Sequence, residues 1–314
     1  MVAASGARVY AVEVQVLARL RIAFVACFLA SATACSLLVD LSGLAEKAEA
    51  RDSGLEAASD ATLSVDAGAD VEVPDVLQRT RRGLMALYVF DEDGGKVIHD
   101  TSDAAGVHLN IDYAPPPLGD GGVGEAATSG PSVTWQQPGM RVVGRVLAAS
   151  AAPATSIAAE CARSNALTVE AWVAPLDGQQ GGPARIVTMS DTGNVQVRNF
   201  TLGQSGANYI FRLRTAGVVA EYRTDGGAGP RLTHVVATAS AGGALTLWID
   251  GAPSTFALPP GAFDFQPFRL AIANEIAGFE SERLWRGDYR LVAIYCTALS
   301  ATEVARNRAV GPPR

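Results

Sequence analysis

The chain has few of the side chains that most often carry chemistry in proteins. Its 314 residues include only three histidines, four cysteines and 7% aromatic residues. The histidines (His99, His108 and His234) lack both the i,i+4 spacing and the cysteine neighbours of a zinc site. No nucleophile elbow and no phosphate-cradling glycine motif occurs in the sequence. The sequence therefore argues against zinc chemistry, a serine hydrolase triad and a phosphate-binding loop.

The larger part of the chain also has little net charge. Residues 36–78 hold ten acidic residues against Lys47 and Arg51, a net charge of −8, whereas residues 1–35 carry +2. Because the whole chain carries −7, residues 79–314 are left close to neutral. A nucleic-acid-binding domain presents a strongly basic surface. We therefore expect no nucleic-acid partner.

An apolar stretch near the N-terminus predicts export. Arg19 and Arg21 flank the apolar run Ile22–Ala30, and small residues then lead to Cys35. A basic flank, an apolar run of about 7–15 residues and a small-residue cleavage site describe a secretory signal. A cysteine directly after the small residues resembles the lipobox of bacterial lipoproteins. We therefore expect residues 1–35 to be a lipoprotein-type signal with lipidation at Cys35; an ordinary cleaved signal and a retained helix are the alternatives.

The segment after Cys35 is acidic and poor in large apolar residues. Ser36 at the position after the cysteine resembles lipoproteins sorted to the outer membrane of Gram-negative cells, which predicts an exported, outer-membrane lipoprotein. From Ser36 to Gln78 the chain has no aromatic residue, so it cannot bury enough apolar surface to offset its ordering entropy. We expect residues 36–82 to be a disordered acidic tether, with an amphipathic helix over Leu41–Leu55 as the alternative.

Two cysteines, Cys161 and Cys296, fall in the exported part. Thiols pair readily in oxidising compartments. We therefore predict a disulfide between them; the alternative is two separately buried thiols.

From Gly83 onward the composition predicts an all-β fold. Short alternating runs are separated by Gly, Pro, Asp and Asn, as in antiparallel sheets. Asp250–Gly251 is a strong two-residue hairpin signal, and Ser300 with Glu303 has the form of a capping box that starts one C-terminal helix. The expected fold is a two-sheet antiparallel jelly-roll sandwich. The clearer strands are expected at 84–90, 167–173, 185–189, 195–202, 209–215, 218–223, 232–239, 245–249, 268–273 and 289–295.

Several of these segments carry a family resemblance. Four segments follow one another in the order of one known family: Gly83–Gly95, the strand LTVEAWV at Leu167–Val173, LTLWIDG at Leu245–Gly251 and the closing segment Arg290–Ser300. They resemble the LamG-like jelly-roll family of the concanavalin A-like lectin/glucanase superfamily. The resemblance implies one domain over residues 83–314 and a non-catalytic carbohydrate- or protein-binding module. A fold alone does not define a function.

The acidic pattern of the superfamily's glucanases is absent from the sequence. Those enzymes use a strand with the pattern E-x-D-x-x-E, whose acids act as nucleophile and general acid. The nearest string, Asp70-Val-Glu72-Val-Pro-Asp75, has different spacing and lies in the expected tether. Glu170 stands alone in its strand, which favours a structural role. We expect no enzymatic activity, with a divergent glycoside hydrolase or a purely structural envelope domain as alternatives.

Two ligand hypotheses remain. Many lectin-like jelly rolls bind calcium through loop oxygens, because this hard cation takes six to eight of them. Candidate ligands are Asp191, Asn194, Asn199, Asn274 and Glu275, although Asp and Asn also simply form turns. No other cofactor is required. Trp285 is the candidate sugar-stacking residue because its neighbours on both sides are polar, whereas Trp172 and Trp248 are expected in the core. The expected partner is a glycan or an envelope or extracellular protein, with membrane contact only through the lipid.

Overall fold

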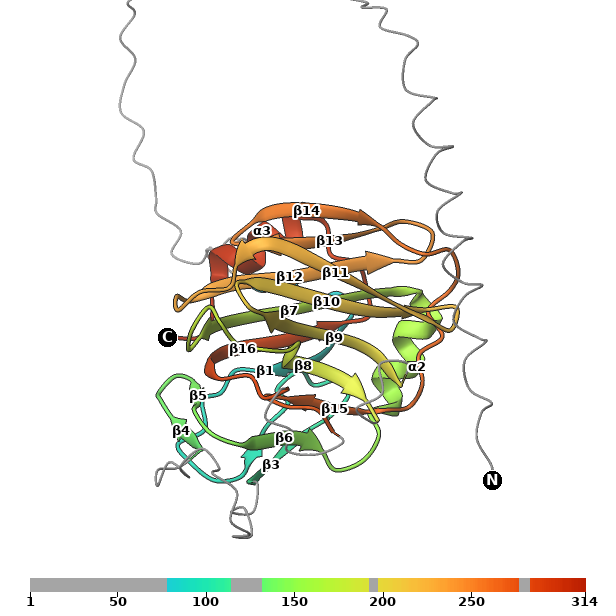
Figure 1. Cartoon of the computed structure of the whole chain (residues 1–314). Helices are drawn as coiled ribbons and strands as arrows, with labels where there is room; N and C mark the ends of the chain where they lie inside the picture. The colour runs from blue at the N-terminus through green and yellow to red at the C-terminus, as the bar shows by residue number, and fades with distance from the viewer. Residues whose placement is uncertain (1–77, 114–131, 192–196, 277–282) are drawn as a thin grey trace, which may run out of the picture. The chain divides into compact units, whose positions relative to one another are not determined.

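The computed structural model describes residues 78–113, 132–191, 197–276 and 283–314. These residues form two antiparallel β-sheets packed face to face, together with two helices (Figure 1). The predicted jelly-roll sandwich is therefore confirmed. The predicted signal, Cys35 and most of the predicted tether lie outside the described residues. Neither described helix has the length and apolar character needed to cross a bilayer.

We call the first sheet sheet A. Its strand order is β14-β13-β12-β7-β16-β5-β4, and β1 also pairs with β16. The central strands β7 and β16 run antiparallel, with Val169 opposite Ile294. The strands are β1 (Leu84–Tyr88), β4 (Val133–Trp135), β5 (Met140–Val142), β7 (Ala166–Pro175), β12 (Thr233–Ser240), β13 (Ala244–Ile249), β14 (Ala252–Ala257) and β16 (Gly287–Tyr295).

We call the second sheet sheet B. Its order is β11-β10-β9-β8-β15-β6-β3-β2, again with antiparallel neighbours. The strands are β2 (Val97–Ile98), β3 (Leu109–Tyr113), β6 (Val146–Ser150), β8 (Ala184–Ser190), β9 (Arg198–Ser205), β10 (Asn208–Thr215), β11 (Val218–Gly227) and β15 (Arg269–Ile272).

The main core fills the space between the sheets. Alternation along each strand sends every second side chain inward, for example Val169 and Ala171 from β7 and Phe211 and Leu213 from β10. The β13–β14 hairpin turns at Asp250–Gly251, as predicted, and both residues have the positive φ that a type I′ turn requires (50° and 87°).

Two helices flank the sandwich. The capping box between Ser300 and Glu303 begins helix α3 (Ala301–Val310), as the sequence predicts. Helix α2 (Thr155–Ser164) is not predicted, because Ala154 at its N-cap provides no side-chain cap. The signal that could have revealed α2 is the spacing of its buried residues Ile157, Ala158 and Cys161, which share one helical face.

The predicted disulfide is confirmed. Cys161 on α2 bonds to Cys296, which directly follows β16, at a sequence separation of 135 residues. The bond therefore attaches the unpredicted helix to the central strand of sheet A.

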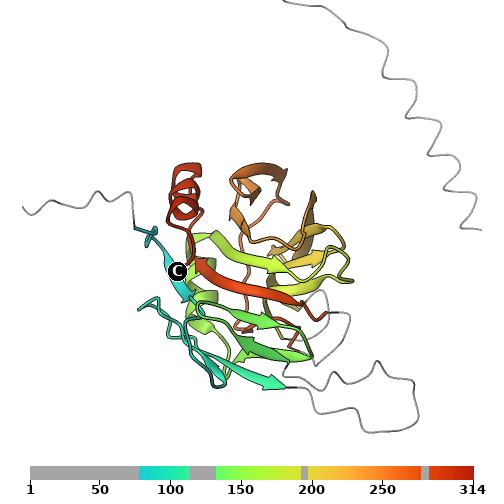
Figure 2. The same ribbon diagram turned by 90° about the vertical axis from the view of Figure 1, so that its left-hand side faces the viewer.

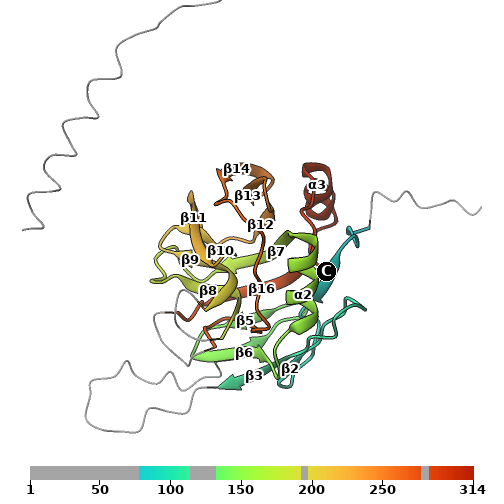
Figure 3. The same ribbon diagram turned by 90° about the vertical axis from the view of Figure 1, so that its right-hand side faces the viewer.

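Helix α3 lies on the side of sheet A that faces away from sheet B (Figure 3). A second, smaller hydrophobic cluster fills this interface, in which Val304 of α3 packs with Val236, Leu291 and Tyr295. Figure 2 shows α3 beside the segment that leads into β1. The outer face of sheet A is therefore partly covered, and the outer face of sheet B is the other surface to consider.

Candidate functional site: the outer face of sheet B

Strand alternation places arginines on the outer face of sheet B. Along β10, Tyr209, Phe211 and Leu213 point into the core. Arg212 and Arg214 must therefore point outward. The side chains of β10 that face away from the core therefore include two arginines, which makes this side of the strand basic.

The register of the sheet aligns polar residues in one row. Arg212 lies opposite Glu221 of β11 on one side and Thr201 of β9 on the other. Thr201 in turn lies opposite Thr188 of β8, and their hydroxyls are 2.7 Å apart. Beyond Thr188 the row continues with the small apolar Ala271 of β15. The polar half of the face thus covers β8 to β11.

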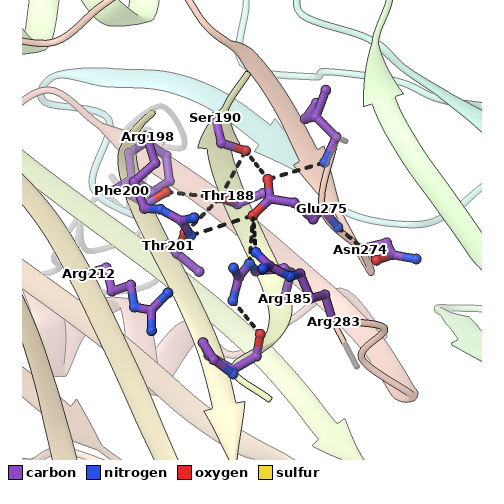
Figure 4. A network of polar contacts seen from close by, with 12 residues as sticks. Arg185, Thr188, Ser190, Arg198, Phe200, Thr201, Arg212, Asn274, Glu275 and Arg283 are labelled. Carbon is purple, nitrogen blue, oxygen red and sulfur yellow. Dashed lines mark hydrogen bonds and ion pairs between the residues drawn. The ribbon is translucent and has the colours of Figure 1, made fainter. Parts of the chain in front are cut away.

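Glu275, which follows β15, lies at the centre of this polar half (Figure 4). Its carboxylate is 3.0 Å from the Arg185 guanidinium, 3.5 Å from that of Arg198 and 3.7 Å from that of Arg283. The Ser190 hydroxyl donates a further hydrogen bond to it. Glu275, Arg185 and Arg198 are fully buried, whereas the Arg283 side chain is 27% exposed. One carboxylate therefore serves three guanidinium groups.

The wider face holds further arginines in ion pairs. Arg212 and Arg223 both pair with Glu221, and Arg214 pairs with Asp264. The described ion pairs of this face thus join six arginines to three acids; Glu280 and Glu282, close to Arg283 in sequence, lie outside the described residues. We refer to these six residues as the arginine cluster: Arg185, Arg198, Arg212, Arg214, Arg223 and Arg283.

The pKa values of the two buried arginines are lowered by burial and by the neighbouring arginines. Burial lowers the pKa of Arg185 to about 10; Glu275 raises it, but the charges of Arg212 and Arg283 lower it further. Burial and the charge of Arg185 likewise lower the pKa of Arg198 to about 10, against the opposing effect of Glu275. Arginine side chains normally keep their proton and positive charge in proteins. An additional anion would therefore stabilise this face.

Two buried donors of this region also lack partners. The Nη2 atom of Arg185 and the Nδ2 atom of Asn274 have no hydrogen-bond acceptor among the described residues. A buried donor without a partner costs about 1–3 kcal/mol. These two groups are donors, which suits an anionic ligand, whereas the Oδ1 atom of Asp264 on the same face is a buried acceptor without a hydrogen-bond partner among the described residues.

Three of the candidate calcium ligands, Asn199, Asn274 and Glu275, have other partners in the structure. Asn199 exchanges two hydrogen bonds with the backbone of Gln266, and Asn274 Oδ1 accepts from the backbone of Glu275. Glu275 is occupied by arginines, and Asp191 is exposed at the end of β8. Asn194 lies outside the described residues. Within the described part of the chain, no group of three or more His, Cys, Asp or Glu side chains could hold a metal ion, and calcium binding stays a prediction.

Trp285 does not fit its predicted role in sugar stacking. The side chain is fully buried in the main core, where its Nε1–H donates to Gln204 Oε1 at 3.0 Å and its ring packs edge-on against Tyr289. A sugar needs an exposed ring face, and this ring has none. Arg286 and Arg283, the polar neighbours that suggested exposure, are partly exposed around a tryptophan that alternation turns inward. Trp172 and Trp248 were expected in the core, and both are half-buried and pack against the smaller hydrophobic cluster.

Glu170 has the structural surroundings expected of it. It is fully buried under α3, where it accepts hydrogen bonds from His234 (2.9 Å), Asn307 (2.8 Å) and Tyr295 (3.2 Å) and forms an ion pair with Arg79. Burial raises the pKa of this carboxyl, but the hydrogen bond from His234 and the charge of Arg79 outweigh it and lower the pKa to about 2. His234 is likewise a packed residue, stacked on the Trp172 ring at 4.7 Å.

The arginine cluster was missed by sequence reasoning. Residues 79–314 as a whole are close to neutral, and the arginines come from distant points of this part of the chain. The net charge therefore gives no sign that they converge. One local signal was present: in Asn208–Thr215 two arginines alternate with large apolar residues, which places both on the face opposite the core. Their neighbours from β8 and β9 become visible only once the strand order is known.

Comparisons with known proteins agree with this architecture. The family model described as the concanavalin A-like lectin/glucanases superfamily (Laminin_G_3) matches residues 149–305. No curated protein matches the sequence significantly.

Among solved structures, the binding domain of botulinum neurotoxin DC in complex with rat synaptotagmin II has a TM-score of 0.51 and 11% identity, over 74% of this chain and 52% of that chain. The Trypanosoma rangeli sialidase in complex with sialic acid has a TM-score of 0.51 and 16% identity, over 72% of this chain and 32% of that chain. This chain therefore spans about half of the neurotoxin chain and a third of the sialidase. At these identities the likeness extends to the fold alone.

Proposed function

The chain belongs to the concanavalin A-like lectin/glucanase superfamily, and on this premise we propose that it is a non-catalytic binding module for an acidic carbohydrate. The arginine cluster on the outer face of sheet B is the proposed ligand surface. The observation that carries the proposal is the convergence of arginines there, where Arg185, Arg198 and Arg283 share the Glu275 carboxylate and one guanidinium nitrogen of Arg185 lacks a hydrogen-bond partner among the described residues. Guanidinium groups match carboxylate, sulfate and phosphate groups in shape and charge.

The accessible arginines would make the first contact with the ligand. The side chains of Arg212, Arg214 and Arg223 are 15%, 18% and 54% exposed. The buried pair Arg185 and Arg198 lies behind them and adds a positive field. Similar structures include complexes with sialic acid and with synaptotagmin, so glycan and protein partners both occur among proteins that share this fold. A protein with an acidic surface is the second candidate partner.

The pairing of the carboxylates supports a binding role over hydrolysis. A glycoside hydrolase needs two carboxyls that are available as acid and nucleophile or base. On this face Glu221, Asp264 and Glu275 are each bound to at least one arginine, and Asp225 of β11 is a further exposed carboxylate. Burial raises the pKa of Glu221, but its hydrogen bonds with Arg212 and Arg223 outweigh this and lower the pKa, which is the wrong direction for a general acid.

We also propose that the module is exported and attached to the outer membrane through lipid on Cys35. The sequence around Cys35 supports this, and a disulfide between Cys161 and Cys296 suits an oxidising compartment. Incorporation of a labelled fatty acid by the wild-type chain, and its loss in C35S, is the expected result. Labelling of C35S at the wild-type level would contradict the lipid anchor.

A glycan array tests the binding function directly. The chain is applied with calcium and with a chelator, so that the calcium prediction is tested as well. We expect signals on sulfated or carboxylated glycans that fall about tenfold or more in R212Q/R214Q, since each lost charged contact is worth about 1 kcal/mol or more. R163Q is the matched control, because Arg163 is an exposed arginine on α2 that pairs only with Glu160 among the described acids. Binding restricted to neutral glycans, or unchanged in R212Q/R214Q, would overturn the proposal.

A further inference from the structure

The strands at the ends of the two strand orders differ in how well they resist further pairing. β4 and β2 hold only three and two residues, and β14 carries Pro253. Short strands and prolines are common protections of a free sheet edge. β11 has ten residues and no proline, and among the described strands its one partner is β10. The other edge of β11 therefore offers a row of backbone groups for pairing.

The hairpin between β10 and β11 shows which backbone groups point to this edge. Thr215 lies opposite Val218, and the two residues between them have positive φ (46° and 79°), as in a type I′ turn. A hydrogen bond between its first and last residue closes such a turn, so Val218 pairs with β10. Because hydrogen-bonded and non-hydrogen-bonded pairs alternate, the N–H and C=O groups of Val219, Glu221 and Arg223 point to the free edge. No turn or loop of the described residues bonds to them.

The inward side of β14 extends past the strands of sheet B. On β13 the inward-pointing Leu245 and Leu247 are buried. Their partners on β14 are Phe256 and Ser254, of which Ser254 is exposed and Phe256 only half-buried. The Phe256 ring lies 5.5 Å from the Tyr222 ring of β11, and Figure 1 shows β14 beyond β11 at this side of the sandwich. A strand added to β11 would therefore also pack against β14.

The two sides of β11 define the chemistry of such a strand. On the inward side Val218 is 54% exposed and Ala220 is half-buried, so the added strand gains by presenting apolar residues there. On the outward side the Arg223 side chain is 54% exposed and pairs with Glu221, which also holds Arg212. Two arginines share this one acid. A further acid directly opposite Arg223 would therefore be favourable.

We propose that β11 binds an extended segment of a partner protein as an additional antiparallel strand of sheet B. The segment alternates apolar residues, which face β14, with polar residues, and it places an acid opposite Arg223. The docking edge comprises residues 219–223, because the register with β10 shifts beyond Arg223, where the exposed Asp225 lies. A second copy of this chain is not the proposed occupant, since its own β14 would extend into the same space. The interaction does not depend on the proposed glycan binding, which uses the outer face of sheet B and not its edge.

Amide hydrogen exchange, followed by NMR on the full chain, tests the proposal. The probe is the end-blocked peptide Asp-Val-Thr-Val-Thr, and the control peptide has Lys in place of Asp. With the Asp peptide in excess, we expect exchange of the Val219, Glu221 and Arg223 amides to slow by about tenfold or more. The Lys peptide is expected to bind about threefold or more weakly, because it places like charges opposite each other. Unchanged exchange of these three amides with the Asp peptide would overturn the proposal.

Variants of β11 separate this edge from other sites. V219P removes one N–H that faces the free edge, and proline is tolerated in an edge strand at such a position. We expect V219P to lose the protection at Glu221 and Arg223, V219T to keep it, and R223E to reverse the preference between the two peptides. Protection that persists in V219P, or an unchanged preference in R223E, would overturn docking at this edge. Protection that appears without peptide and rises with protein concentration would identify a second copy as the occupant and contradict the proposal.

Discussion

The two outer faces of the sandwich each bury one carboxylate, and the charge around the two is balanced in opposite ways. Glu170 on sheet A has one arginine, a histidine and two neutral donors around it. Glu275 on sheet B has three arginines and a serine. In the first network the carboxylate is stabilised, and its pKa is lowered to about 2. In the second, the arginines are destabilised, and the pKa values of Arg185 and Arg198 are lowered to about 10.

We interpret the Glu170 network as structural and the Glu275 network as part of the proposed ligand site. The Glu170 network fastens α3 and the N-terminal segment to sheet A, as the bonds from Asn307 and Arg79 show, and His234 Nδ1 is its buried atom without a hydrogen-bond partner among the described residues. The Glu275 network holds more positive than negative charge in its described ion pairs. A buried ion pair is costly unless it is well compensated. Under the proposed function, the sheet B face is the one that an external anion would stabilise.

The largest effect is expected from E275Q. Removing the Glu275 carboxylate takes away the acid that Arg185, Arg198 and Arg283 share, and Arg185 and Arg198 are fully buried. Breaking a buried pair in this way costs about 3–5 kcal/mol of unfolding free energy. Urea denaturation measures the loss, and added sulfate is expected to recover more stability in E275Q than in the wild type. A loss of stability without any recovery by sulfate would contradict the view that the missing component is negative charge.

A somewhat smaller effect, with a characteristic pH dependence, is expected from E170Q. The lowering of the Glu170 pKa from 4.5 to about 2 on folding corresponds to about 3 kcal/mol. Because the folded-state pKa is the lower one, this stabilisation is present above about pH 4.5 and is lost as the pH falls toward 2. Urea denaturation of both proteins should therefore give a difference at pH 7 that shrinks by pH 3. E160Q, which removes an exposed carboxylate on α2, is the control. A pH-independent difference would contradict this electrostatic account.

Reduction of the disulfide is expected to weaken the fold without changing the comparison between the faces. Loss of a native disulfide costs about 2–5 kcal/mol in small secreted domains. The Cys161–Cys296 bond attaches α2 to sheet A, and neither cysteine belongs to the Glu170 or the Glu275 network. Thermal melts with and without reductant should therefore shift by the same amount in sulfate and in chloride. A sulfate response that disappears on reduction would mean that the arginine cluster depends on the disulfide.

The smallest expected effect is that of S190A. The Ser190 hydroxyl donates to Glu275, and a hydrogen bond to a charged group contributes about 1.5–3 kcal/mol. The three arginines remain on the carboxylate, so we expect a loss near the lower end of that range in chemical denaturation. T238A is a control on the other sheet, since Thr238 is a strand residue with neutral partners. A loss in S190A as large as in E275Q would mean that the serine, and not the charge, organises the network.

The sequence predicts the fold better than the site, for a physical reason. Alternation, the Asp250–Gly251 turn and the Ser300–Glu303 capping box are local signals, and all three appear in the structure. The arginine cluster depends on which strands become neighbours, and this is a property of the topology. Trp285 is the instructive error, because its polar sequence neighbours suggested exposure while alternation turns its ring into the core. Helix α2 was missed because its start carries no side-chain cap.

The most direct test of the central claim is the thermal stability of the wild type and R212Q/R214Q when chloride is replaced by sulfate at constant ionic strength. A ligand that binds only the folded state stabilises it by mass action, and about 1–2 kcal/mol corresponds to a rise of roughly 2–8 °C for a domain of this size. We predict such a rise in the wild type, an equal rise in E170Q and a much smaller rise in R212Q/R214Q. Equal rises in the wild type and R212Q/R214Q would contradict an anion site at the arginine cluster.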